Sequence, residues 1–281
     1  MKVKLFITVF FFSLISYAQN FSGKATYKTI RKSNFKINSK NSDITEKQAE
    51  EIQKRIQKMN QKTYILQFDK NSSIYKLDAK INTPKPKMGN GNRVMVMSFG
   101  GSGNGDVYYK NIQDKRFVNK TEIMGKLFLV KDSLRNFDWK LTSETKNIGE
   151  YTCYKATFEN EVTNTKVSMV NGELKEQTEQ VKVVTNAWYT PQVPISNGPK
   201  DYYGLPGLIL EINDGTNTIV CTEIVIDPSQ TKEIKEPVKG KIVSQREYQE
   251  ISRKKSKEMM ERFKSRKGVN MGNGATIKIG G

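Results

Sequence analysis

Short runs in which apolar and polar residues alternate recur along most of this chain, and they restrict it to a β-rich fold. The first run covers residues 21–30, where Phe21, Ala25 and Tyr27 alternate with polar neighbours. Similar runs, rich in Val, Ile, Tyr, Phe and Thr and bounded by turn residues, cover 63–69, 73–78, 107–112, 116–123, 126–132, 138–142, 151–158 and 181–190. Strands this close in sequence pair antiparallel. We therefore predict a mainly β fold, α+β at the margins. Its centre is one large curved antiparallel sheet, a half-barrel, a bowl or a folded sandwich.

Two hairpins are indicated by their turn residues. Asn171-Gly172 is a strong signal for a two-residue hairpin turn. The segment 207–227 contains a second hairpin, which turns near Asp214-Gly215.

Two helices are expected, one inserted in the sheet and one near the C-terminus. Residues 43–60 begin with a capping box of Thr45 and Gln48 and carry one narrow apolar stripe. Residues 243–268 begin with a second capping box, Ser244 and Glu247. The apolar side of this second helix is sparse, as expected for a helix that is docked only in part.

The two ends of the chain suggest export and an extension. Residues 1–18 combine an n-region containing Lys2 and Lys4, an apolar run and a small-x-small cleavage pattern. We expect a cleaved signal peptide and a mature chain that begins at Gln19; an uncleaved anchor is the alternative. Residues 19–230 then form the β-rich domain, and residues 231–281 a basic helical and Gly-rich extension.

Charge and residue usage restrict the chemistry. The formal net charge is +18, which favours peripheral contact with an anionic surface or serves solubility alone; no specific nucleic acid is expected. The basic extension is interpreted either as a segment that binds such a surface or as a solvated helix. The chain has no histidine, so catalytic triads, histidine bases and histidine metal sites are excluded. We expect no metal site and no cofactor.

Cys153 and Cys221 are the only cysteines. In an exported chain two cysteines suggest a disulfide. The alternative is a pair of buried, reduced thiols on separate strands.

Between two strand-like runs lies a stretch dense in proline, glycine and aromatic residues. Trp188 and Tyr189 end the first run, and Leu208 and Ile209 begin the second. Proline ends ladder pairing, and glycine permits a tight bend and close approach of another backbone. The residues between the two runs that we assign to this stiff crossing are Pro191, Pro194, Gly198, Pro199, Gly204, Leu205, Pro206 and Gly207.

The same stretch resembles the GLPGLI family of exported Bacteroidota proteins, whose name is the motif at residues 204–209. The resemblance covers about residues 19–230 and is strongest over 139–212. The further matching positions are Trp139, Leu141, Ile148, Gly149, Tyr151, Cys153, Lys155, Ala156, Ala187, Trp188, Tyr189, Thr190, Pro191, Pro194, Gly198, Pro199 and Tyr203. It implies a periplasmic or surface-associated β-rich domain. The family has no established activity.

Three functional hypotheses follow. The first is a non-catalytic accessory module in which Tyr202 and Tyr203 belong to a ligand rim for an apolar or glycan ligand or an outer-membrane partner; the alternative is that these aromatics are core. The second is a hydrolase that uses Asp201, Glu211 or Asp214. The third is a structural adaptor that acts through the basic helix.

Overall fold

The computed structural model describes residues 21–31, 61–78, 105–170, 173–226, 234–265 and 276–279. The expected signal peptide at 1–18 and the expected helix at 43–60 lie outside these residues. Within the described part, no helix is long and apolar enough to span a membrane.

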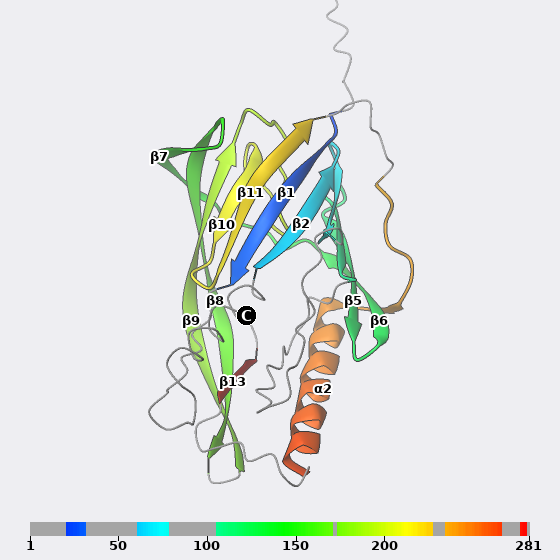
Figure 1. The fold of residues 1–281 in the computed structure, drawn as a ribbon. Coiled ribbons are helices and arrows are strands. Elements are labelled where there is room, and N and C mark those ends of the chain that lie inside the picture. Colours follow the sequence, from blue (N-terminus) through cyan, green and yellow to red (C-terminus); the bar gives the residue numbers. More distant parts are fainter. Residues whose placement is uncertain are drawn as a thin grey trace, which may run out of the picture.

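The fold is mainly β, as predicted, and consists of one open sheet of thirteen strands (Figure 1). The strands are β1 Gly23–Arg31, β2 Gln61–Phe68, β3 Ser72–Leu77, β4 Val107–Asn111, β5 Arg116–Ile123, β6 Lys126–Ser133, β7 Lys140–Ile148, β8 Tyr151–Val170, β9 Glu173–Thr190, β10 Leu208–Asn213, β11 Asn217–Ile226, β12 Lys241–Val243 and β13 Thr276–Ile279. Their order is β12-β6-β5-β4-β3-β2-β1-β11-β10-β9-β8-β13, and β7 also pairs with β8. Among these strands only β12 pairs in parallel, with β6.

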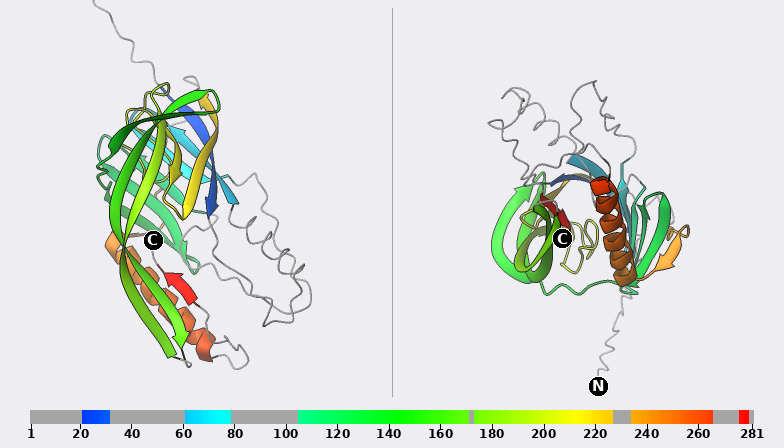
Figure 2. Two further views of the ribbon diagram at one scale, coloured as in Figure 1. Left: turned by 90° about the vertical axis from the view of Figure 1, so that its left-hand side faces the viewer. Right: turned by 90° about the horizontal axis from the view of Figure 1, so that it is seen from below.

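The sheet curves into an arch that does not close into a barrel (Figure 2). Seen from below, β8 and β9 form one side of the arch and β5 and β6 the other. Its concave face carries the core, because alternate residues of each strand point inward. In β1, for example, Ala25 and Tyr27 are fully buried, and Tyr27 pairs with the buried Tyr64 of β2.

Both predicted hairpins are confirmed. Strands β8 and β9 pair from Tyr154 and Tyr189 up to Val170 and Glu173, although the two turn residues between them are outside the described part. Strands β10 and β11 turn at Asp214, whose Oδ1 accepts bonds from the N–H groups of Thr216 and Asn217. This arrangement is an Asx-type turn, which explains why Asp precedes Gly there.

The C-terminal extension is joined to the sheet closely. Ile234 packs on Tyr109, Val118 and Leu129, which are buried on the outer face of β4, β5 and β6. Strand β12 then extends the sheet beside β6. The predicted boundary at residue 230 lies outside the described residues and stays a prediction.

The predicted C-terminal helix is confirmed as α2, Gln245–Ser265. Ser244 and Glu247 form the expected capping box, in which Glu247 Oε2 accepts from Ser244 N at 2.7 Å and Ser244 Oγ accepts from Glu247 N at 3.2 Å. The first turns dock on the sheet, since Tyr248 packs edge-on against Phe128 and its hydroxyl lies 3.2 Å from Thr121 Oγ1.

Glu236 holds the start of the extension against the sheet. Its carboxylate accepts from Arg116 Nη1 at 2.6 Å and from Lys131 Nζ at 2.9 Å. Burial alone would raise the pKa of Glu236, but the bonds from Lys131 and Arg116 outweigh it and the pKa is lowered. Because the folded pKa is depressed, this contribution to stability is complete above the unfolded pKa near 4.5 and is lost as pH falls through the folded value.

We therefore expect Glu236→Gln to lower stability at pH 7 and to have a smaller effect as the solution is acidified below about pH 4.5. Urea unfolding of the wild type and E236Q at several pH values measures this difference. A difference that stayed constant from pH 7 to pH 3 would show that the Glu236 carboxylate does not hold the extension.

Candidate functional site

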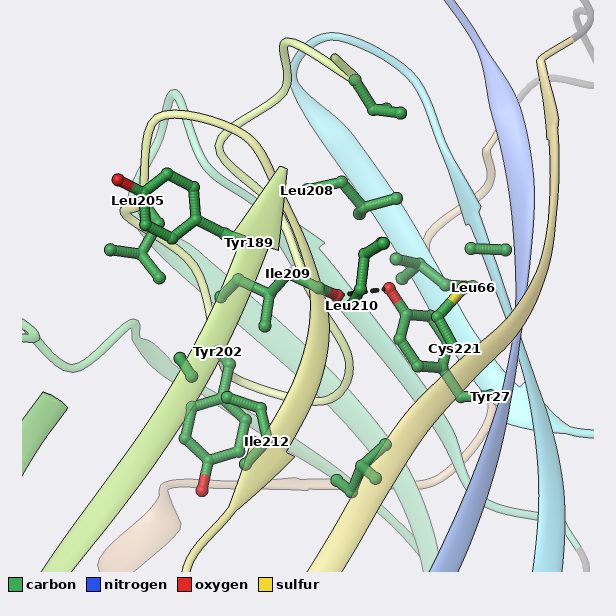
Figure 3. Packing of buried hydrophobic residues seen from close by; sticks show 14 of the residues in the cluster. Tyr27, Leu66, Tyr189, Tyr202, Leu205, Leu208, Ile209, Leu210, Ile212 and Cys221 are labelled. Carbon is green, nitrogen blue, oxygen red and sulfur yellow. Dashed lines mark hydrogen bonds between the residues drawn. The ribbon is translucent and has the colours of Figure 1, made fainter. Parts of the chain in front are cut away.

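The residues between β9 and β10 lie inside the arch, and we call residues 191–207 the crossing segment. Strands β9 and β10 are neighbours in the sheet, so the segment leaves the sheet and returns beside the strand it left. Its side chains Val193, Ile195 and Leu205 are buried in the same core as the sheet residues. Figure 3 shows this packing, with Leu205 and Tyr202 close to the inward side chains of the strands.

Glycine is required where the crossing segment touches the neighbouring strands. A Cβ on Gly207, whose φ is +154°, would lie 2.2 Å from Thr190 O. A Cβ on Gly198 would lie 2.9 Å from the Cβ of Ile209. Gly207 is explained by the close approach of the Thr190 backbone and Gly198 by that of the Ile209 side chain. Of the prolines, Pro191, Pro194 and Pro206 are exposed and Pro199 is buried.

Backbone bonds join the crossing segment to the start of β10. The N–H of Leu208 donates to Val193 O at 3.0 Å, and that of Ile209 donates to Asn197 O at 2.9 Å. The hydroxyl of Tyr27 on β1 donates to Ile209 O at 2.7 Å (Figure 3). The motif at residues 204–209 therefore belongs to the architecture of the core.

Lys110 on β4 fixes the crossing segment from the other side of the arch. Its side chain is fully buried, and Nζ donates to Gly198 O at 3.1 Å, Lys200 O at 3.0 Å and Tyr202 O at 2.7 Å. An ammonium has three N–H donors, so three carbonyl oxygens satisfy it. Burial lowers the pKa of Lys110 to about 7, and the carboxylate of Asp201 acts in the opposite direction.

Asn197 provides a second internal anchor. It is fully buried, and its Oδ1 accepts from Ser73 Oγ on β3 at 3.3 Å and from Gly198 N at 2.8 Å. Its backbone forms an isolated bridge with Tyr203. Together Asn197 and Lys110 tie one turn of the crossing segment to β3 and β4.

Trp188 and Tyr189 point to opposite faces of β9. Tyr189 is buried, whereas Trp188 is only partly buried. Lys146 Nζ lies 4.4 Å from the centre of the Trp188 ring and donates to Glu211 Oε2 at 2.7 Å. This cation–π and ion-pair contact links β7, β9 and β10 across the outer face.

The three carboxylates considered for hydrolysis have separate partners. Asp201 pairs with Arg135 Nε at 3.2 Å, Glu211 pairs with Lys146, and Asp214 caps its own turn. Among the described residues, no group of three or more Cys, Asp or Glu side chains is arranged to hold a metal ion.

Tyr202 and Tyr203, the candidate rim residues, are 8% and 9% exposed. They pack against Phe137, with ring centres 5.5 and 5.8 Å away. Burial raises the pKa of Tyr202, as does the nearby carboxylate of Asp201, so its phenol stays neutral at pH 7. Little of either ring is left for a ligand.

Other aromatic rings of this region are in contact with solvent. Phe137 stacks on Trp139 with centres 5.2 Å apart and planes 9° apart, and Phe158 meets Phe137 edge-on at 5.1 Å. All three are partly exposed. Trp139 Nε1 donates to Tyr203 O at 2.9 Å, which fixes the indole. We call Phe137, Trp139, Phe158, Tyr202 and Tyr203 the aromatic cluster.

Arg135 lies over the aromatic cluster. Its Cζ is 4.3 Å from the centre of Phe137 and 5.4 Å from that of Phe158. Its side chain is 43% exposed. The region thus combines ring faces, a guanidinium and a carboxylate at one margin of the arch.

Sequence patterns did not single out Lys110, Arg135 or Phe137. Lys110 stands in an ordinary alternating strand, where a lysine is expected to face solvent. Phe137 lies two residues before Trp139. This proximity to a motif residue was the one sequence feature that could have indicated a role for Phe137.

The two cysteines are free, buried thiols. They lie on β8 and β11, with β9 and β10 between them in the sheet. The suggested bridge is not formed in this structure. Burial raises the pKa of Cys153 to about 11 and that of Cys221 to about 12, so both thiols stay protonated at pH 7.

A family model described as a protein of unknown function (Porph_ging) matches residues 139–211. These residues run from Trp139 of the aromatic cluster to Glu211, just after the motif at 204–209. No curated protein matches the chain.

Two solved structures of PNGF-II, in the C2 and P21 space groups, resemble the chain with TM-scores of 0.44 and 0.46 and 15% identity. The similarity covers 84% of this chain and 33% and 34% of those chains. The chain thus spans about a third of the length of PNGF-II, and the match supports no conclusion on activity.

Replacing Lys110 by Met is expected to lower the free energy of unfolding by at least about 3 kcal/mol, because three buried carbonyl oxygens lose their donor. Urea unfolding measures the loss. Lys200→Met is the matched control: this side chain is exposed, so the expected change is within about 0.5 kcal/mol. Equal effects of the two substitutions would contradict the role assigned to Lys110.

Substitutions at two glycines distinguish the cost of a steric clash from the cost of backbone strain. Gly215, at φ +83°, has no atom within 4 Å of a built Cβ, so Gly215→Ala should cost about 1 kcal/mol from strain alone. Gly207→Ala adds a clash with backbone and should cost more than about 3 kcal/mol or prevent folding. Thermal and urea unfolding of both variants check this order, and similar values would contradict it.

Proposed function

We propose that this chain is an exported cell-envelope protein of the GLPGLI kind that binds a saccharide without cleaving it. The expected location rests on the signal-like residues 1–18. The finer family assignment rests on the motif at 204–209 and on the matching positions upstream of it. The proposed activity rests on the aromatic cluster.

The carrying observation is the set of partly exposed rings of Phe137, Trp139 and Phe158, which lie beside Arg135 and Asp201. Aromatic faces accept the apolar faces of ligands, and a few convergent polar groups orient them. A wholly apolar ligand would desolvate the charges of Arg135 and Asp201 without replacing their bonds to water. A saccharide offers both an apolar ring face and hydroxyl groups.

Catalysis is not the function that these residues support best. Acid–base chemistry on a glycosidic bond uses two carboxylates that face the same bond. Asp201, Glu211 and Asp214 are instead engaged with Arg135, Lys146 and a turn. An adaptor role through α2 has no specific support either, because cations of the helix pair within it, as in Arg246–Glu250 and Lys255–Glu258.

Phe137→Leu tests the proposal, because leucine keeps most of the buried volume but removes the ring face. We expect affinity for a saccharide to fall at least about tenfold while stability falls by only about 1 kcal/mol. In a Trp188→Phe background, Trp139 is the one remaining indole, and its fluorescence reports binding of tetrasaccharides from neutral and acidic series.

Tyr154→Leu is the control. This ring is 39% exposed on β8, contacts Tyr189 and lies outside the aromatic cluster, so its loss should leave affinity unchanged. The proposal is rejected if no tetrasaccharide gives a saturable signal, or if F137L and Y154L weaken binding equally.

A further inference from the structure

We propose that the saccharide bound at the aromatic cluster carries a carboxylate, as in a uronic acid, and that Arg135 binds that carboxylate. This inference rests on the proposed function and narrows its ligand class. It is drawn from the geometry of Arg135, which no sequence motif indicated.

Arg135 packs against aromatic rings while part of it stays in solvent. Its Cζ lies 4.3 Å from the centre of Phe137, 5.4 Å from that of Phe158 and 5.7 Å from that of Tyr202. Three rings thus surround one side of a guanidinium whose side chain is 43% exposed. A guanidinium ordered in advance loses little conformational entropy when it binds a ligand.

Arg135 also retains unused donors. Its ion pair with Asp201 is made through Nε, at 3.2 Å. Within the described part of the chain, neither Nη1 nor Nη2 donates a hydrogen bond to another residue. A planar pair of N–H donors matches the two oxygens of a carboxylate in the bidentate geometry.

The net charge of the chain also favours an anion, even though the carboxylate of Asp201 already pairs with Arg135. The chain as a whole carries +18, which raises the local concentration of anionic ligands. A neutral sugar would gain nothing from this field.

The test compares tetragalacturonate with its fully methyl-esterified form, which keeps the sugar rings and removes the charge. We expect the full-length mature protein to bind the acid at least about tenfold more tightly than the ester at low salt, with the ratio shrinking as salt is added. Arg135→Gln should abolish the preference. Arg135→Lys keeps the charge and the packing stem, and it should retain only a small part of the preference.

Lys200→Gln is the matched control, because it removes a neighbouring positive charge that contacts no ring, and it should keep the acid preference. Near-UV circular dichroism of each variant confirms that the cluster is intact. Equal binding of acid and ester overturns this inference but leaves saccharide binding in place. Absence of binding to either overturns both. Inorganic phosphate that binds as tightly as tetragalacturonate would reduce Arg135 to a simple anion site and also overturn the inference.

Discussion

The buried amino group of Lys110 is the interaction on which the interior of this protein depends. It collects three carbonyl oxygens from one turn of the crossing segment and binds that turn to β4. A large open sheet would otherwise expose its concave face to water. Because the crossing segment covers that face, the protein buries a core without closing the sheet into a barrel. The glycines at positions 198 and 207 are therefore explained by close packing.

The aromatic cluster follows from the same arrangement. Tyr202 contributes both a carbonyl oxygen to Lys110 and a ring to the cluster, so the backbone anchor also positions the ring. Trp139 is fixed in turn by the carbonyl oxygen of Tyr203. The margin where Arg135 and Phe137 meet solvent is thereby supported by buried bonds, as a binding surface with a low ordering cost requires.

Local patterns predicted much of the fold, and long-range contacts account for what they missed. The strands, the turn at Asp214 and the capping box of Ser244 depend on neighbours within a few residues, so they were readable from the sequence. Lys110 depends on carbonyl oxygens about 90 residues away in the chain, and no periodicity reveals such a pair. The disulfide was suggested by residue type alone, without the strand order that separates Cys153 from Cys221. The contacts of Arg135 with Phe158 and Tyr202 likewise join residues far apart in sequence.

Native-state hydrogen exchange tests the central claim most directly. If the crossing segment is part of the core, the amides of Asn197, Tyr202 and Leu208 exchange only when the whole protein unfolds, with the same free energy as amides in the middle of β1. Exchange of these amides several orders of magnitude faster than that of β1 would show that the segment opens on its own. That result would contradict the claim that Lys110 holds the crossing segment to the sheet.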